Sequence, residues 1–149
     1  MTSPELRLCI PIDAARLEES REDVRLFLQD HGVEEQTVED LVLCVHEACA
    51  NSIEHSLSRA AIDVELRVGP TSVSVVVADK GFGLDLDLYD PRRKPELLQP
   101  GGRGFYVMAC LMDELEVHID GGTVIRMNKL ITCVPTSDGR GPTGSACSE

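Results

Sequence analysis

Aromatic residues are scarce in this sequence, at 3% of the chain, and tryptophan is absent. Proteins that bind single-stranded nucleic acid stack its bases on aromatic side chains, so a platform of that kind is not expected. Positive charge is scarce as well, because 14 lysines and arginines stand against 26 acidic residues, a formal net charge of −12. Such a charge repels nucleic acid and anionic membranes, and it favours a basic protein partner.

Long apolar runs are also missing. Stretches such as residues 75–78 are far shorter than the roughly 20 residues that a membrane-spanning helix needs. The first ten residues, MTSPELRLCI, lack the basic start and the apolar run of a signal peptide. A cytoplasmic protein with no membrane contact is therefore expected.

Cysteines with metal-binding spacing are the third absence. The six cysteines contain no CxxC motif, and His31, His46 and His118 show no zinc-ligand spacing relative to them. No zinc site is expected, and the cysteines are expected to be reduced thiols that mostly fill the core. They are Cys9, Cys44, Cys49, Cys110, Cys133 and Cys147.

The residues that are present suffice for one hydrophobic core. The chain has 149 residues, of which 42% are hydrophobic, and a domain of this length buries roughly 70% of the surface that its unfolded chain exposes. With so few aromatic residues, the core must be aliphatic. We expect one domain over residues 1–134, followed by a disordered tail, residues 135–149, which is rich in glycine, serine, proline and threonine.

Hydrophobic periodicity predicts the order of the elements as strand, two helices, hairpin, loop, helix and hairpin. Pro11 places the first strand at a sheet edge. The stretch from about residue 84 to residue 102 shows no period and contains three prolines, as a functional loop would. Strands are expected at residues 6–12, 62–68, 73–78, 115–119 and 123–131, and helices at residues 13–31, 35–58 and 104–112.

Glu47 and Asn51 lie four residues apart on the second predicted helix, so they share one face of it. A carboxylate can take a proton from a hydroxyl, and an amide oxygen can ligate a hard cation such as Mg²⁺. Taken alone, the pair could equally belong to a solvated polar stripe along the helix.

Two glycine clusters follow. Asp79 ends a strand rich in β-branched residues, and Gly81 and Gly83 come directly after it, where they would let the backbone approach a ligand. Seen in isolation, this is also an ordinary turn after a strand. The second cluster, residues 101–104 with the sequence GGRG, opens a predicted helix, whose free N–H groups suit an anion, although a flexible helix cap would look the same.

Neither cluster fits the commoner phosphate-binding motifs. A Walker A loop ends in Gly-Lys-Ser/Thr, whereas Phe105 follows Gly104. A GxGxxG motif that started at Gly81 would need glycine at position 86, where Leu86 stands. Both the P-loop and the Rossmann interpretations are therefore rejected.

The order of the three motifs resembles the GHKL ATPase superfamily. Residues 47–51 (EACAN) match its N box, residues 79–83 (DKGFG) its G1 box and residues 102–104 (GRG) its G2 box. The wider segments EACANSIEHS, VADKGFGLD and GGRGFYVMACLMDELEV are similar to the compact anti-sigma-factor serine/threonine kinases, over about residues 5–133. The resemblance implies an α+β two-layer sandwich of the Bergerat type, with a mixed, mostly antiparallel sheet covered on one face by about three helices.

The resemblance also implies ligands and roles. Asn51 would ligate the Mg²⁺ that bridges the phosphates of ATP, Asp79 would accept from the adenine amino group, and Gly81 and Gly83 would allow its close approach. Glu47 would act as general base on the attacking serine hydroxyl.

Further positions are assigned near this pocket. By resemblance, Gly102, Arg103 and Gly104 would form the hinge of a lid over about residues 84–103. His55, two turns after Glu47, could line the pocket edge, or it could be a plain surface or core histidine. The basic run at residues 92–94 could meet phosphate or a partner, or it could be a solvated turn.

The function that follows is an Mg-ATP-dependent serine/threonine protein kinase. By resemblance it would hold a sigma factor inactive, phosphorylate a STAS-domain anti-anti-sigma antagonist, and form a homodimer. One alternative is a non-catalytic partner-switching module in which ATP only shapes a binding surface for a sigma factor or another regulator. A second is an α/β domain that binds no nucleotide.

Overall fold

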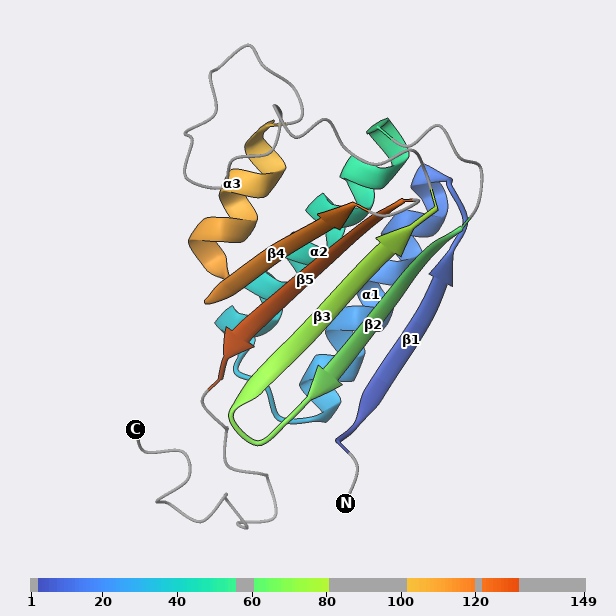
Figure 1. Ribbon diagram of the computed structural model, residues 1–149. Helices are drawn as coiled ribbons and strands as arrows, with labels where there is room; N and C mark the ends of the chain where they lie inside the picture. Colours follow the sequence, from blue (N-terminus) through green and yellow to red (C-terminus); the bar gives the residue numbers. More distant parts are fainter. Residues whose placement is uncertain (1–2, 56–60, 81–101, 120–121, 132–149) are drawn as a thin grey trace.

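The computed structural model describes residues 3–55, 61–80, 102–119 and 122–131. In this part of the chain, five strands form one sheet, and three helices, α1 (Ala14–Asp30), α2 (Glu35–His55) and α3 (Gly102–Leu111), lie along one face of it (Figure 1). The strand order is β1-β2-β3-β5-β4, and all four pairs are antiparallel. The strands are β1 (Glu5–Ile10), β2 (Ile62–Val68), β3 (Ser72–Asp79), β4 (Glu114–Ile119) and β5 (Thr123–Leu130).

This arrangement confirms the predicted α+β two-layer sandwich. The prediction allowed a mixed sheet, whereas the described pairs are antiparallel throughout. The strand that precedes Pro11 is an edge strand, as expected, because β1 pairs with β2 alone among the described strands. No helix in the described ranges is long and apolar enough to cross a membrane.

The core lies between the sheet and the helices, and it is almost wholly aliphatic. Alternate residues of β2 are buried, and so are the residues of α2 that recur every three or four positions, such as Val38, Leu41 and Val45. Phe105 is the one aromatic side chain among the fully or nearly fully buried residues that the structure describes. Helix α2 is therefore fixed along its length by burial against the sheet.

Two of the four described cysteines contribute to this core. Cys44 and Cys49 are buried, whereas Cys9 and Cys110 are exposed. Burial raises the pKa of each buried thiol to about 12, and for Cys44 the nearby carboxylates of Asp40 and Glu47 add to the rise. The expectation that the cysteines mostly fill the core therefore holds for only half of those described, because Cys9 points to the open face of β1 and Cys110 to the outer face of α3.

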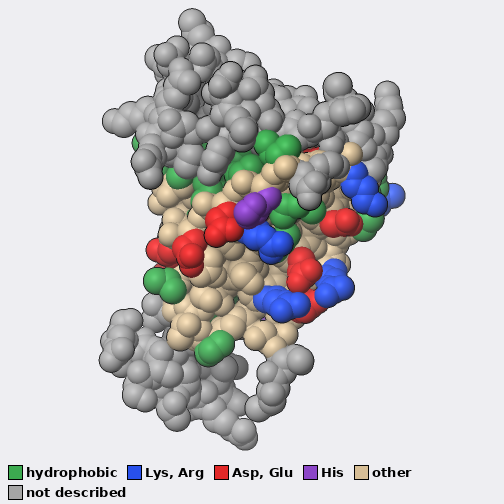
Figure 2. Space-filling view, viewed as in Figure 1, with side chains coloured by type: hydrophobic (Ala, Val, Ile, Leu, Met, Phe, Trp, Pro, Cys, Tyr) green, Lys and Arg blue, Asp and Glu red, His purple; other side chains and the backbone are tan. Residues whose placement is uncertain are grey.

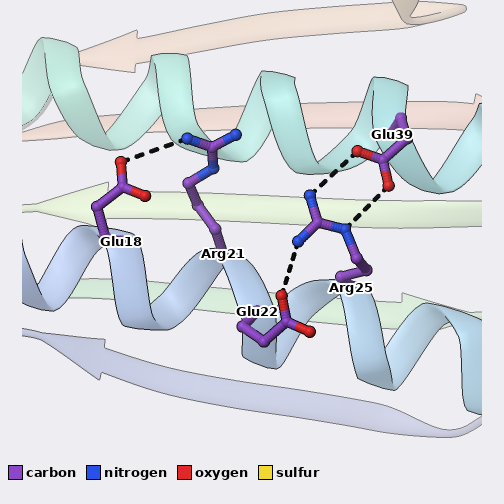
Figure 3. Close-up of polar contacts among 5 residues, drawn as sticks. All are labelled: Glu18, Arg21, Glu22, Arg25 and Glu39. Carbon is purple, nitrogen blue, oxygen red and sulfur yellow. Dashed lines mark hydrogen bonds and ion pairs between the residues drawn. The ribbon is translucent and has the colours of Figure 1, made fainter.

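Capping residues fix the two ends of α1, and an ion pair connects α1 to α2. The Asp13 side chain caps α1 by accepting from the Ala15 N–H at 2.9 Å, and Gly32, at φ 76°, ends the helix in a conformation that favours glycine. Between the helices, Arg25 donates two hydrogen bonds to the Glu39 carboxylate, at 2.9 and 3.0 Å, and a third to Glu22 at 2.8 Å (Figure 3).

The other face of the sheet is open to solvent in the described part of the molecule and carries side chains of both charges (Figure 2). One row crosses all five strands in register: Arg7, Glu65, Val76, Arg126 and Glu116. A hollow of about 400 Å³ lies over the part of this row from Glu65 to Glu116 and over the neighbouring row.

Candidate functional site: the helix-covered end of strand β3

Asp79, the last residue of β3, is a buried carboxylate with two described donors. The residue is only 9% exposed. The Ser52 hydroxyl of α2 donates to Oδ2 at 2.6 Å, and the Thr123 backbone N–H donates to Oδ1 at 3.3 Å. A carboxylate held in this way presents acceptor atoms at the end of the strand.

Thr123, the first residue of β5, and the preceding Gly122 lie close to Asp79. Thr123 pairs with Asp79 in the β3–β5 register. The preceding residue, Gly122, has φ 155°, and a Cβ there would stand 2.0 Å from the Asp79 carbonyl oxygen. A side chain at this position would therefore force the two strands apart next to the carboxylate, so the geometry requires glycine.

Helix α2 brings Glu47, Asn51 and Ser52 to the same end of the molecule. Asn51 is 5% exposed, and its Nδ2 has no hydrogen-bond partner among the described residues. Glu47 is half-buried. An unpaired amide in a buried position is rare in proteins, so this one suggests a group that binds there.

Helix α3 begins beside these residues. A Cβ on Gly104 would lie 3.2 Å from Asn51 Nδ2, 3.5 Å from Asn51 Oδ1 and 3.4 Å from Glu47 Oε1. Gly104 is the third residue of α3, so the first turn, with backbone N–H groups that no preceding turn can pair, lies against the two polar side chains. This turn contains no acidic residue, and a helix start of this kind attracts anions.

The site therefore unites residues of three separate segments. Glu47, Asn51 and Gly104 come together directly, and Asp79 is joined to them through Ser52. Gly102 begins α3. Gly81, Gly83, the basic run at residues 92–94 and the predicted lid up to residue 101 lie outside the described residues, as do residues 135–149, and the side chains of Arg103 and His55 are not described either.

Three residues of the site were missed in the sequence. Ser52, Gly122 and Thr123 all contact or crowd Asp79. The sequence predicts only a hairpin turn at residues 120–122, and Ser52 enters only as part of the wider segment EACANSIEHS that carries the family resemblance. The predicted hairpin indicates that a strand starts after Gly122, but not which other strand it lies beside, so the sequence alone holds no signal that brings Gly122 and Thr123 to Asp79.

Metal-binding capacity at this site rests on few protein atoms. No group of three or more His, Cys, Asp or Glu residues in the described ranges is arranged to hold a metal ion. A single amide oxygen such as that of Asn51 is compatible with Mg²⁺, which usually keeps several waters and is bound through one or two protein ligands together with phosphate oxygens.

Comparison with known proteins identifies the family. The model of the histidine kinase-like ATPase domain matches residues 10–129. A serine-protein kinase RsbW from Bacillus licheniformis is 33% identical over 119 residues, which is 72% of this chain and 74% of the relative. The Bacillus subtilis serine-protein kinase RsbW is 32% identical over 63% of this chain and 65% of its own length.

Solved structures agree on the fold. The RsbU and RsbW domains of a Mycobacterium tuberculosis protein match 87% of this chain and 33% of that chain, with a TM-score of 0.64 at 18% identity. The histidine kinase domain of a blue-light activated kinase from Erythrobacter litoralis matches 94% of this chain and 66% of that chain, with a TM-score of 0.50 at 21% identity. The chain belongs to the histidine kinase-like ATPase family, whose members bind ATP, and within that family to the serine-protein kinases of the RsbW type.

Proposed function

We propose that this serine-protein kinase transfers the γ-phosphate of Mg-ATP to a serine or threonine of a STAS-domain anti-anti-sigma protein, and that it otherwise holds a sigma factor inactive. The observation that carries the proposal is the close approach of Gly104 to both Glu47 and Asn51, whose polar atoms would lie 3.2 to 3.5 Å from a Cβ at this position. This approach would bring the proposed base, the proposed cation ligand and the start of a helix to one point.

The adenine end of the pocket is assigned to Asp79. Its carboxylate can accept from an exocyclic amino group, and its described contacts to Ser52 and Thr123 keep it in place. Gly81 and Gly83 are proposed to let the base come close, as the family resemblance implies.

The phosphate end is assigned to Asn51 and the start of α3. The residues fit a magnesium–phosphate group, because the Asn51 amide is buried without a described partner for its Nδ2 and because Gly104, which has no side chain, faces it. Asn51 would hold Mg²⁺ through its amide oxygen, and the ion would neutralise phosphate charge. Gly102, Arg103 and Gly104 are proposed as the hinge of a lid over residues 84–103.

Glu47 is proposed as the general base. In the transfer, the acceptor oxygen forms a bond to the γ-phosphorus, and the bond from that phosphorus to the β–γ bridging oxygen breaks, so that ADP leaves. The proton of the acceptor hydroxyl passes to the Glu47 carboxylate. The half-buried position of Glu47, next to Asn51 and Gly104, would leave it accessible both to a bound acceptor hydroxyl and to the solvent.

The charge of the protein supports a basic partner. Helix α2 carries five acidic residues and neither lysine nor arginine, and the chain as a whole has a net charge of −12. Sigma factors contact DNA through basic faces, so opposite charge would speed their encounter with this protein.

A homodimer through the open face of the sheet is also proposed. The row that crosses the five strands carries, in order, a positive, a negative, a neutral, a positive and a negative side chain. These are Arg7, Glu65, Val76, Arg126 and Glu116. If a second copy faces it across a two-fold axis parallel to β3, each charge meets the opposite charge, with Val76 at the centre. Sedimentation should then give a dimer for the wild type, a monomer for Arg126→Glu, and a dimer again for Glu65→Arg combined with Arg126→Glu.

The kinase proposal is tested by replacing Glu47 and Asn51 separately. Glu47→Gln should leave the Kd for Mg-ATP within about threefold of the wild type, while phosphate transfer to the co-encoded STAS protein falls by about 10² to 10⁴. Asn51→Ala should weaken binding of Mg-ATP at least about tenfold and reduce its dependence on Mg²⁺.

Other outcomes would favour the alternatives. Normal ATP binding without transfer by the wild type to any co-encoded STAS protein would favour the non-catalytic partner-switching module. Equal transfer by Glu47→Gln and the wild type would remove Glu47 as the base.

A further inference from the structure

We propose that Ser52 determines the preference of this site for a purine that carries a 6-amino group, because it fixes the Asp79 carboxylate as an acceptor. The inference rests on the proposed function, in which Asp79 meets the base. Ser52 acts through Asp79 and is thus a positioning residue.

Ser52 forms the shorter of the two described contacts to Asp79. Its hydroxyl oxygen lies 2.6 Å from Oδ2, whereas the Thr123 nitrogen lies 3.3 Å from Oδ1. Both partners are buried, with Ser52 4% and Asp79 9% exposed. A hydrogen bond to a carboxylate at this distance, shielded from water, is among the strong kinds.

The direction of this hydrogen bond decides what Asp79 can bind. A carboxylate has no proton, so the Ser52 hydroxyl must donate, and the backbone N–H of Thr123 can only donate. The protein therefore treats Asp79 as an acceptor on both oxygens. A 6-amino group donates to such a carboxylate, whereas a 6-oxo group would place acceptor against acceptor.

Ser52 also differs from an ordinary buried helical serine. Ser20, 5% exposed on α1, donates to the Leu17 carbonyl of its own helix at 2.7 Å, the local arrangement common for serine in helices. Ser52 instead directs its proton to Asp79, a residue 27 positions away on another element. Since Ser52 follows Asn51, one turn of α2 contacts both ends of the proposed pocket.

The experiment measures Kd for three nucleotides in the full chain. They are ATP, purine riboside triphosphate, which lacks the 6-amino group, and inosine triphosphate, which has a 6-oxo group, each with Mg²⁺. The wild type should bind ATP most tightly. Ser52→Ala should weaken ATP binding about tenfold and change the binding of purine riboside triphosphate by less than about threefold, so that the preference ratio shrinks.

Two variants serve as controls. Ser20→Ala removes an equally buried hydroxyl away from the site and should leave the ratio unchanged. Ser52→Thr retains the hydroxyl and should retain the wild-type ratio. Because each ratio is measured within one protein, a smaller folded fraction cancels from it.

The outcomes separate this inference from the proposed function. If Ser52→Ala keeps the wild-type ratio, with or without weaker ATP binding, the positioning role of Ser52 is wrong while ATP binding stands. If the wild type itself binds no ATP at millimolar concentration, both proposals are wrong.

Discussion

Gly104 of α3 lies so close to Asn51 of α2 that a Cβ on the glycine would stand 3.2 Å from the asparagine Nδ2. The same Cβ would stand 3.4 Å from the carboxylate oxygen Oε1 of Glu47. The absence of a side chain at position 104 is thus what lets the first turn of α3 reach the polar face of α2. The site depends on this contact between helices that are about 50 residues apart in the sequence.

Gly104→Ala should damage function more than stability. Alanine is favoured over glycine inside a helix by about 1 kcal/mol, and this gain should largely offset the crowding, so the free energy of unfolding should stay within about 1 kcal/mol of the wild type. The added methyl would displace the Asn51 amide and the Glu47 carboxylate by a few tenths of an ångström. Phosphate transfer should therefore fall about tenfold or more.

A matched control is Gly69→Ala in the turn between β2 and β3. Its Cβ would stand 3.3 Å from the Ser72 carbonyl oxygen, a similar crowding away from the site. Urea unfolding and ATP titration of both variants separate the effects. Equal ATP binding and transfer by Gly104→Ala and the wild type would contradict the assignment of this contact to the site.

Gly122→Ala should lower both stability and ATP affinity. The methyl would overlap the Asp79 carbonyl, at 2.0 Å, and φ 155° is unfavourable for alanine. Relief requires β5 to move away from β3, so the free energy of unfolding should fall by at least about 2 kcal/mol. Thermal unfolding with and without ATP checks this, and an unchanged midpoint together with unchanged ligand stabilisation would show that the strands tolerate the side chain.

The sequence predicted the elements better than the contacts between them. Alternation in residues 62–68 and the helical spacing in residues 35–58 report burial against one face, and the structure has a strand at Ile62–Val68 and a helix at Glu35–His55. Periodicity carries no information about which strand lies beside β3. The neighbour β5, which supplies Thr123 to Asp79, therefore became visible only in the sheet order.

The site was predictable in part for the same reason. Glu47 and Asn51 share a helix face by spacing alone, and this is a local property. Their meeting with Gly104 depends on packing between α2 and α3, which only the resemblance to a known family implied in advance. Ser52 was missed because its partner lies 27 residues away, and no spacing rule connects a helix position to a strand end at that distance.

The buried thiols should resist alkylation. Burial raises the pKa of Cys44 and Cys49 to about 12, so at pH 8 only about one such thiol in ten thousand is ionised, and the thiolate is the reactive form. Iodoacetamide followed by peptide mass mapping of the native protein should modify Cys9 and Cys110 before Cys44 and Cys49. Modification of Cys44 or Cys49 at the same rate would contradict their burial. The same reagent in 8 M urea should modify all four of these cysteines.

The Arg25–Glu39 pair should stabilise the protein in a pH-dependent way. Hydrogen bonds from Arg25 hold the pKa of Glu39 below its usual value, so the unfolded chain binds a proton at this position at higher pH than the folded one does. The pair is partly exposed, and its contribution at neutral pH should be about 0.5 to 1 kcal/mol. That contribution is complete above the unfolded pKa, about 4.3, and it disappears as the pH falls through the folded pKa.

Urea unfolding of the wild type and Glu39→Gln between pH 7 and pH 3 should show a difference in the free energy of unfolding that is constant down to about pH 5 and then shrinks towards zero. Glu19→Gln, which removes a carboxylate on the exposed face of α1 with only an (i, i+3) pair to Arg16, is the control and should give a smaller difference. A gap between wild type and Glu39→Gln that widens on acidification would reverse the sign of the linkage and rule out the pair as its source.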